Sequence, residues 1–75
     1  MTQFTYRAFL TPKDEGGFSV NVPTLPGCFT QGETLQEAIE MTKEAVSVYI
    51  ESLKAQDEPI PDDSKNLEYI MTLSF

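Results

Sequence analysis

The groups that could carry chemistry in this chain are one cysteine and twelve carboxylates, and histidine is absent. A nucleophilic cysteine needs a basic neighbour, most often histidine, to hold its thiolate. Cys28 has no histidine to serve it and follows a Pro-Gly pair, so we interpret it as a small buried hydrophobic residue. A lone cysteine without histidine cannot build a structural zinc site either.

The carboxylates are numerous but dispersed. Asp14-Glu15 lies in a glycine-rich turn, Asp62-Asp63 in a polar loop, and most of the others on one face of a helix. Metal-dependent hydrolysis needs several acids that converge from rigid strands, yet Glu68 is the lone acid in a predicted strand. Gly16-Gly17 precedes a strand and so forms no phosphate-binding loop. We therefore expect no catalysis, no cofactor and no metal.

The net charge of −7 points away from nucleic acid and from membrane surfaces, because both attract basic proteins. An acidic chain would attract a basic protein, although the charge would also simply keep a small domain soluble. The N-terminal segment Met1–Tyr6 lacks the pattern of a signal peptide, and no stretch is long and apolar enough to cross a bilayer. These features predict a cytoplasmic protein.

Seventy-five residues predict one domain, residues 1–75, with a small core. A single cysteine permits no internal disulfide, which leaves self-association as the usual way to stabilise so short a chain. We expect a homodimer or a larger homo-oligomer. A marginally stable, well-packed monomer is the alternative.

Hydrophobic alternation predicts a β-hairpin at the N-terminal end of the chain. Apolar and polar residues alternate over Gln3–Leu10 and again over Phe18–Val22, and a turn-forming cluster separates the two runs. Pro-Gly within Leu25–Cys28 favours a type II turn, since proline sets φ at its second position and glycine supplies positive φ at its third. A short third strand then occupies Cys28–Gln31.

One long helix and a final strand follow. Thr34–Glu37 is a capping-box pattern, and apolar residues recur at helical spacing until Pro59 and Pro61 require that the helix has ended by about Asp57. Leu67–Phe75 alternates to the end of the chain, which predicts a last strand. The predicted order is β-β-β-α-β, an α+β fold with the helix on one face of an antiparallel or mixed sheet.

The middle of the chain resembles the HicB family of antitoxins. The resemblance rests on a Pro-x-Leu-Pro-Gly-Cys run, a Gly-x-Thr, two Glu-Ala pairs and a closing Pro-x-Pro. The residues that carry it are Pro23, Leu25, Pro26, Gly27, Cys28, Gly32, Thr34, Glu37, Ala38, Pro59 and Pro61. Thr24 and Glu33 stand where family members often have aspartate.

The resemblance implies a degraded ribonuclease-H-like fold without its catalytic acids. It also implies an antitoxin that binds and blocks HicA, a small basic toxin that cleaves RNA with a histidine, and it implies a dimer or tetramer. Many family members carry a DNA-binding segment after the last strand. This chain stops at Phe75, so we do not expect it to bind DNA alone.

Two sets of surface residues are therefore candidates. The acidic set would contact a basic toxin, and it contains Asp14, Glu15, Glu37, Glu40 and Glu44. The apolar set would contact other copies of the chain, and it contains Phe9, Met41, Val48 and Ile70. The alternative function is a stand-alone homo-oligomeric domain that binds RNA or a small ligand, with a groove built from Arg7, Phe9, Phe18 and Phe29.

Overall fold

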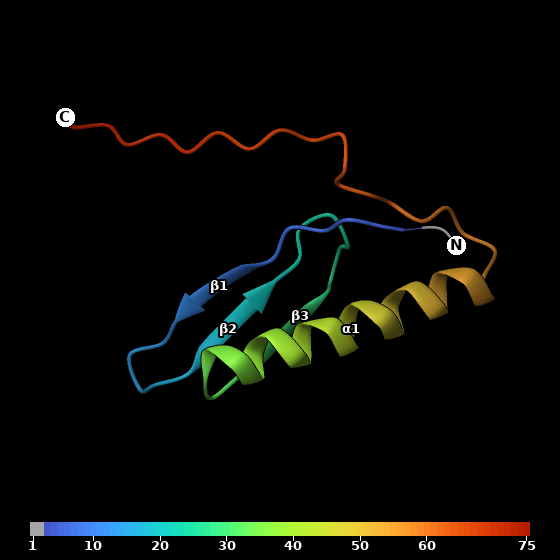
Figure 1. Ribbon diagram of the computed structural model, residues 1–75, viewed down its shortest axis with the longest axis horizontal. Coiled ribbons are helices and arrows are strands. Elements are labelled where there is room, and N and C mark those ends of the chain that lie inside the picture. Colours follow the sequence, from blue (N-terminus) through green and yellow to red (C-terminus); the bar gives the residue numbers. More distant parts are fainter. Residues whose placement is uncertain (1–2) are drawn as a thin grey trace.

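The computed structural model describes residues 3–75, so the first two residues of the N-terminal segment lie outside the described part. Four elements follow in chain order: β1 (Phe9–Pro12), β2 (Phe18–Asn21), β3 (Phe29–Gly32) and α1 (Leu35–Ala55). Figure 1 shows the three short strands with the long helix lying across them. The architecture is α+β, as predicted, with three antiparallel strands followed by one long helix.

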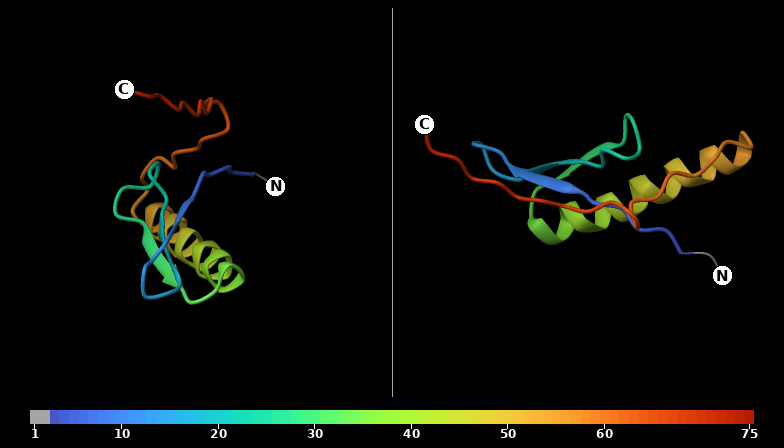
Figure 2. Two further views of the ribbon diagram at one scale, coloured as in Figure 1. Left: turned by 90° about the vertical axis from the view of Figure 1, so that its left-hand side faces the viewer. Right: turned by 90° about the horizontal axis from the view of Figure 1, so that it is seen from above.

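The three strands form one antiparallel sheet in the order β1-β2-β3. Leu10 on β1 lies opposite Val20 on β2, which in turn lies opposite Thr30 on β3. The β1–β2 turn is closed by a hydrogen bond of 3.0 Å from the Lys13 N–H to the Gly17 carbonyl. The predicted hairpin is therefore confirmed, and α1 covers one face of the sheet (Figure 2).

The loop of residues 22–28 connects β2 to β3 and contains a tight turn at Leu25–Cys28. The Cys28 N–H donates to the Leu25 carbonyl at 2.9 Å, and Gly27 has φ of 81°, which confirms the type II geometry. The Val22 N–H donates to the Cys28 carbonyl at 3.1 Å and closes the loop. Because this loop is hydrogen-bonded within itself, it fixes where β3 starts.

Capping interactions define both ends of α1. The Thr34 hydroxyl accepts from the Glu37 N–H at 3.0 Å, as the capping box predicts, while the Glu37 carboxylate accepts from the Glu33 N–H at 2.8 Å, one residue earlier than expected. At the other end, Asp57 has φ of 55° and the Glu58 N–H donates to the Leu53 carbonyl at 2.9 Å. This is a Schellman motif, and it ends the helix where the sequence predicted.

The core is small and lies between the β2–β3 turn and α1. Val22, Leu25 and Cys28 form its buried centre. Five partly buried side chains pack around them: Tyr6, Ala8, Ala45, Val46 and Tyr49. Cys28 is thus the buried hydrophobic residue that the sequence indicated, and its burial raises the pKa of its thiol.

The predicted first strand is wrong over residues 3–8, since β1 begins only at Phe9. The backbone before it bonds to loop side chains instead of to a neighbouring strand. The Thr5 N–H donates to the Asp62 carboxylate and the Arg7 N–H to the Asp63 carboxylate, both at 2.9 Å. Pro12, placed in the turn by the sequence, is the last residue of β1.

The predicted last strand over Leu67–Phe75 is also wrong. We call residues 67–75 the C-terminal arm: it is extended but pairs with no described strand, and it projects away from the sheet (Figure 1). Its large apolar side chains are exposed, with Leu67 at 97%. Alternation in a sequence predicts a two-faced extended segment, but a strand also needs an edge on which its N–H and C=O groups can bond.

Candidate functional site

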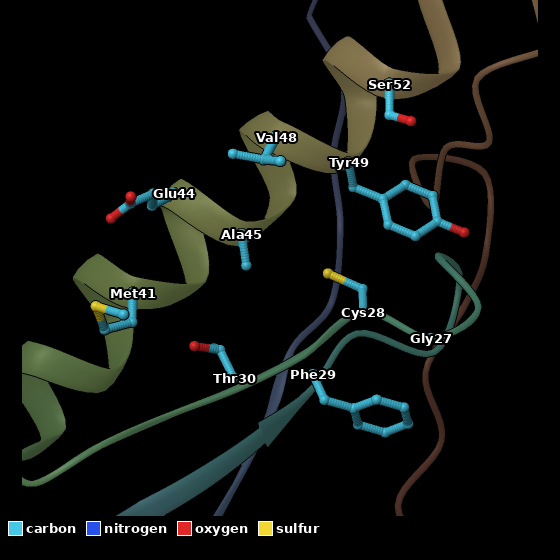
Figure 3. Close-up of a pocket in the computed structure, with 10 residues that line it drawn as sticks. All are labelled: Gly27, Cys28, Phe29, Thr30, Met41, Glu44, Ala45, Val48, Tyr49 and Ser52. Atoms are coloured by element: carbon cyan, nitrogen blue, oxygen red, sulfur yellow. The ribbon is translucent and has the colours of Figure 1, made fainter. Parts of the chain in front are cut away.

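An open apolar groove runs between α1 and β3, and we call it the β3 groove (Figure 3). It has a volume of about 470 Å³. Met41, Ala45 and Val48 line its helix side, and Phe29 and Thr30 line its strand side. Helical spacing explains the arrangement, because side chains three, four and seven residues apart share one face of α1.

The base of the β3 groove is buried and hydrogen-bonded, whereas the side chains along its helix side are exposed. Cys28 is buried at the base, and the Tyr49 hydroxyl donates to the Pro26 carbonyl at 2.7 Å, which ties α1 to the β2–β3 turn. Val48 is 63% exposed and Met41 is 40% exposed, whereas the exposed ring of Phe29 points away from the helix (Figure 3). Large apolar side chains around a hollow are typical of surfaces that another molecule covers.

The acids of the helix border this groove unevenly. Glu44 lines the groove itself. Glu40, one turn earlier, accepts from the Gln36 side chain at 3.0 Å and lies 3.7 Å from the Lys43 ammonium. The Glu40–Lys43 ion pair is exposed, so it contributes little to the stability of the protein. Glu40 therefore stays accessible to a basic group of another protein.

The remaining predicted acidic contacts lie elsewhere. Glu15 from the β1–β2 turn and Glu37 from the start of α1 line a separate polar hollow together with Glu33. Asp14 is exposed in the same turn. The structure therefore divides the five acids into two groups, and it gives Glu37 an architectural task in capping the helix.

The predicted apolar contacts are divided as well. Met41 and Val48 meet in the β3 groove. Phe9 lies on β1, at the opposite edge of the sheet, and Ile70 lies in the C-terminal arm. Helical spacing predicts that Met41 and Val48 lie on one face of α1. The separation of Phe9 from them follows from the strand order, which puts β1 at the far edge of the sheet from β3.

Sequence reasoning missed the structural importance of Asp63, which is only 4% exposed. Its carboxylate accepts from the Arg7 N–H at 2.9 Å, from the Asn66 amide at 2.7 Å and from the Thr24 hydroxyl. Its own N–H donates to the Thr5 carbonyl at 2.8 Å. We call this cluster the Asp63 knot. No local sequence pattern predicts this cluster, because Thr5, Arg7 and Thr24 lie far from Asp63 in the sequence.

The hydrogen bonds of the knot favour the ionised carboxylates. The Thr24 hydroxyl, followed by the Arg7 N–H, lowers the pKa of Asp63 below its ordinary value. The side-chain and backbone groups of Ser64 and the Thr5 N–H likewise lower the pKa of Asp62. Burial, with a smaller effect of these two charges, raises the pKa of the Tyr6 phenol, which donates to the Pro61 carbonyl at 2.6 Å.

We expect Asp63→Asn to lower the Tm by at least several degrees at pH 7 and to weaken the loss of stability in acid. A carboxylate with a lowered pKa stabilises the fold above its unfolded pKa of about 3.9, and this contribution disappears as the pH falls through the lower folded pKa. Thermal unfolding between pH 2 and 7, at one protein concentration, measures both effects. The exposed Glu51→Gln should keep the wild-type profile, and equal acid slopes for Asp63→Asn and wild type would contradict the assignment.

Within residues 3–75, no three Cys, Asp or Glu side chains are grouped so that they could hold a metal ion. The helix of this same part of the chain is not apolar enough to span a membrane.

Together, the fold and the groove define a small α+β domain whose helix covers one face of a three-stranded sheet and borders an open apolar surface. A family model described as "HicB_like antitoxin of bacterial toxin-antitoxin system" matches residues 6–74. The chain belongs to this family. The resemblance inferred from the sequence is thereby confirmed, and it supports an antitoxin role in a toxin–antitoxin system.

Individual relatives agree with this assignment. The UPF0150 protein Ta0767 of Thermoplasma acidophilum is 52% identical over 79% of this chain and 86% of its own length. Antitoxin HicB of Escherichia coli K12 is 39% identical over 75% of this chain, and Antitoxin HicB 1 of Photorhabdus laumondii is likewise 39% identical over 75%. The matches span only 41% and 36% of those two antitoxins.

Proposed function

We propose that this protein neutralises a small basic, RNA-cleaving toxin of the HicA type by binding it in the β3 groove. The observation that carries the proposal is an open apolar groove with an acidic rim, on a chain of net charge −7 that belongs to an antitoxin family. In this proposal the antitoxin acts by covering its partner, and it performs no reaction of its own.

The apolar lining supports a protein partner. Binding energy at protein interfaces concentrates in a few large side chains that become fully desolvated at the centre of the contact. Met41 and Val48 are large, exposed and adjacent to one hollow, so an apolar side chain of the toxin would desolvate both at once. The ring of Phe29 is directed away from the helix (Figure 3), so it would extend the contact at the edge of the groove. Methionine adapts its shape readily, which suits a lining that must fit another surface.

The charges support a basic partner. Glu44 on the groove and Glu40 one turn away would meet a positive surface, and Glu15 with Glu37 extends the negative field toward the β1–β2 turn. Complementary charges of this kind mainly speed encounter and reject wrong partners. The proposal places the pair in the cytoplasm and retains two expectations from the resemblance: the relationship to ribonuclease H and assembly into a dimer or tetramer.

Val48→Lys tests the groove directly. The substitution puts a cation into an apolar wall that faces a basic partner, so we expect the affinity to fall by at least about 100-fold, roughly 3 kcal/mol. The measurement is calorimetric titration with a HicA-type toxin whose catalytic histidine has been replaced. Glu51→Gln is the matched control, because it changes the net charge by the same amount on an exposed part of α1 outside the groove.

The control should bind within about fivefold of wild type, since charges outside an interface core contribute little. Unchanged affinity for Val48→Lys would reject the β3 groove as the contact. Failure of the wild-type chain to bind such toxins at both low and high salt would reject the partner itself.

A further inference from the structure

We propose that the C-terminal arm is an exchanged strand: the arm of one copy adds to the β1 edge of a second copy, and the second arm does the same in return. The partner surface is thus a second copy of this chain. This inference is independent of the proposed toxin contact, because it concerns the opposite side of α1.

The arm has the pattern of a strand that lacks its sheet. Leu67, Tyr69, Met71 and Leu73 alternate with more polar residues and are all exposed. Nine extended residues span about 30 Å, enough to run past the whole of β1 and residues 6–8 before it. Figures 1 and 2 show the arm leaving the body of the molecule instead of lying on it.

The outer edge of β1 pairs with no described strand, so it has room for such a strand. β1 is the outer strand of the sheet, and beside it a second groove of about 290 Å³ lies between the sheet and α1. We call it the β1 groove, and Tyr6 and Ala8 line its sheet side while Thr42 and Val46 line its helix side. A strand added to this edge would direct alternate side chains into the groove.

The start of α1 likewise exposes apolar side chains that no described element covers. Leu35 is 53% exposed and Ile39 is 36% exposed, although both continue the apolar stripe that leads to Thr42 and Val46 in the β1 groove. An apolar stripe at helical spacing ordinarily faces a covering layer. One added strand with an apolar face would cover Leu35, Ile39 and the β1 groove together.

The Asp63 knot explains why the arm does not cover its own edge. The Asp63 carbonyl accepts from the Asn66 N–H at 2.9 Å, and the Arg7 guanidinium donates to the carbonyls of Asp63 and Asn66 at 3.1 and 2.7 Å. These bonds hold a turn at the root of the arm that directs it away from β1. The arm and the edge of one copy both remain open, and reciprocal exchange fills both in a closed two-fold dimer.

Sedimentation equilibrium tests the assembly. We expect the wild-type chain to be a dimer and the double variant Tyr69→Ser/Met71→Ser to dissociate at least about 100-fold more readily. The matched control Glu68→Ser/Thr72→Ser changes the opposite face of the arm and should remain dimeric. Neither pair is expected to unfold the chain, because the arm makes no packing contact with the described core. A monomeric wild type, or an equally stable dimer in both double variants, would overturn the proposal.

Cross-linking distinguishes exchange from pairing within one chain. Thr11 on β1 and Thr72 on the arm are both exposed, so Thr11→Cys/Thr72→Cys in a Cys28→Ala background can be treated with a short bis-maleimide. Exchange predicts a covalent dimer on a denaturing gel, with neither single-cysteine variant reaching the same yield. A covalently closed monomer would show that each arm covers its own β1 edge and would overturn the proposal.

Discussion

Gly32→Ala is expected to lower the free energy of unfolding by at least about 3 kcal/mol. A Cβ at Gly32 would lie 2.4 Å from the Ala38 nitrogen and 2.6 Å from its Cα, so the end of β3 and the first turn of α1 would have to separate. Ala38 is fully buried at this contact. Overpacking against backbone cannot be relieved by a change of rotamer, which places the cost at or above the usual range of about 1–3 kcal/mol.

Urea denaturation followed by circular dichroism, at one protein concentration, measures this loss. Gly16→Ala is the control, because Gly16 also has no side chain but a Cβ there would meet no atom within 4 Å. Its φ of 102° makes the control cost about 1–2 kcal/mol of backbone strain alone. A smaller loss at Gly32 than at Gly16 would show that β3 and α1 are not in this close contact.

Leu25→Ala is expected to destabilise the protein by about 2–5 kcal/mol. Leu25 is fully buried in the turn between β2 and β3 and packs with Val22 and Cys28. The substitution removes that packing and leaves a cavity that the hydrogen-bonded turn cannot close. For a chain of this length the whole free energy of unfolding is about 4–11 kcal/mol, so a large share of it depends on one side chain.

The same denaturation experiment measures Leu25→Ala, and Val48→Ala is its control. Val48 is also an apolar residue but is largely exposed, so its truncation should change stability by no more than about 0.5 kcal/mol. Similar losses for the two variants would contradict the position of the core. Because Val48 belongs to the β3 groove, its variant should be folded and yet impaired in toxin binding.

The parts of the fold that the sequence predicted correctly are those determined by neighbouring residues. The hairpin, the Pro26-Gly27 turn and the Thr34 cap each follow from side chains within a few positions of one another. The joint position of Met41 and Val48 was also predictable, since helical spacing alone puts them on one face.

The parts that the sequence did not predict depend on distant partners. The strand predicted before Phe9 is replaced by bonds to Asp62 and Asp63, more than fifty residues away. Alternation in residues 67–75 indicates an amphipathic extended segment but carries no information about which edge, or which molecule, that segment joins. Local pattern therefore describes each segment's own conformation better than its contacts.

The two grooves lie against different faces of α1, and the residues of these two faces alternate along its sequence. Met41, Ala45 and Val48 face the β3 groove, while Thr42 and Val46 face the β1 groove. Residues on one surface can therefore mutate without altering the other, although the two sets are adjacent in the sequence. Under the two proposals made above, related chains would diverge in toxin recognition through one face of α1 and would retain strand exchange through the other.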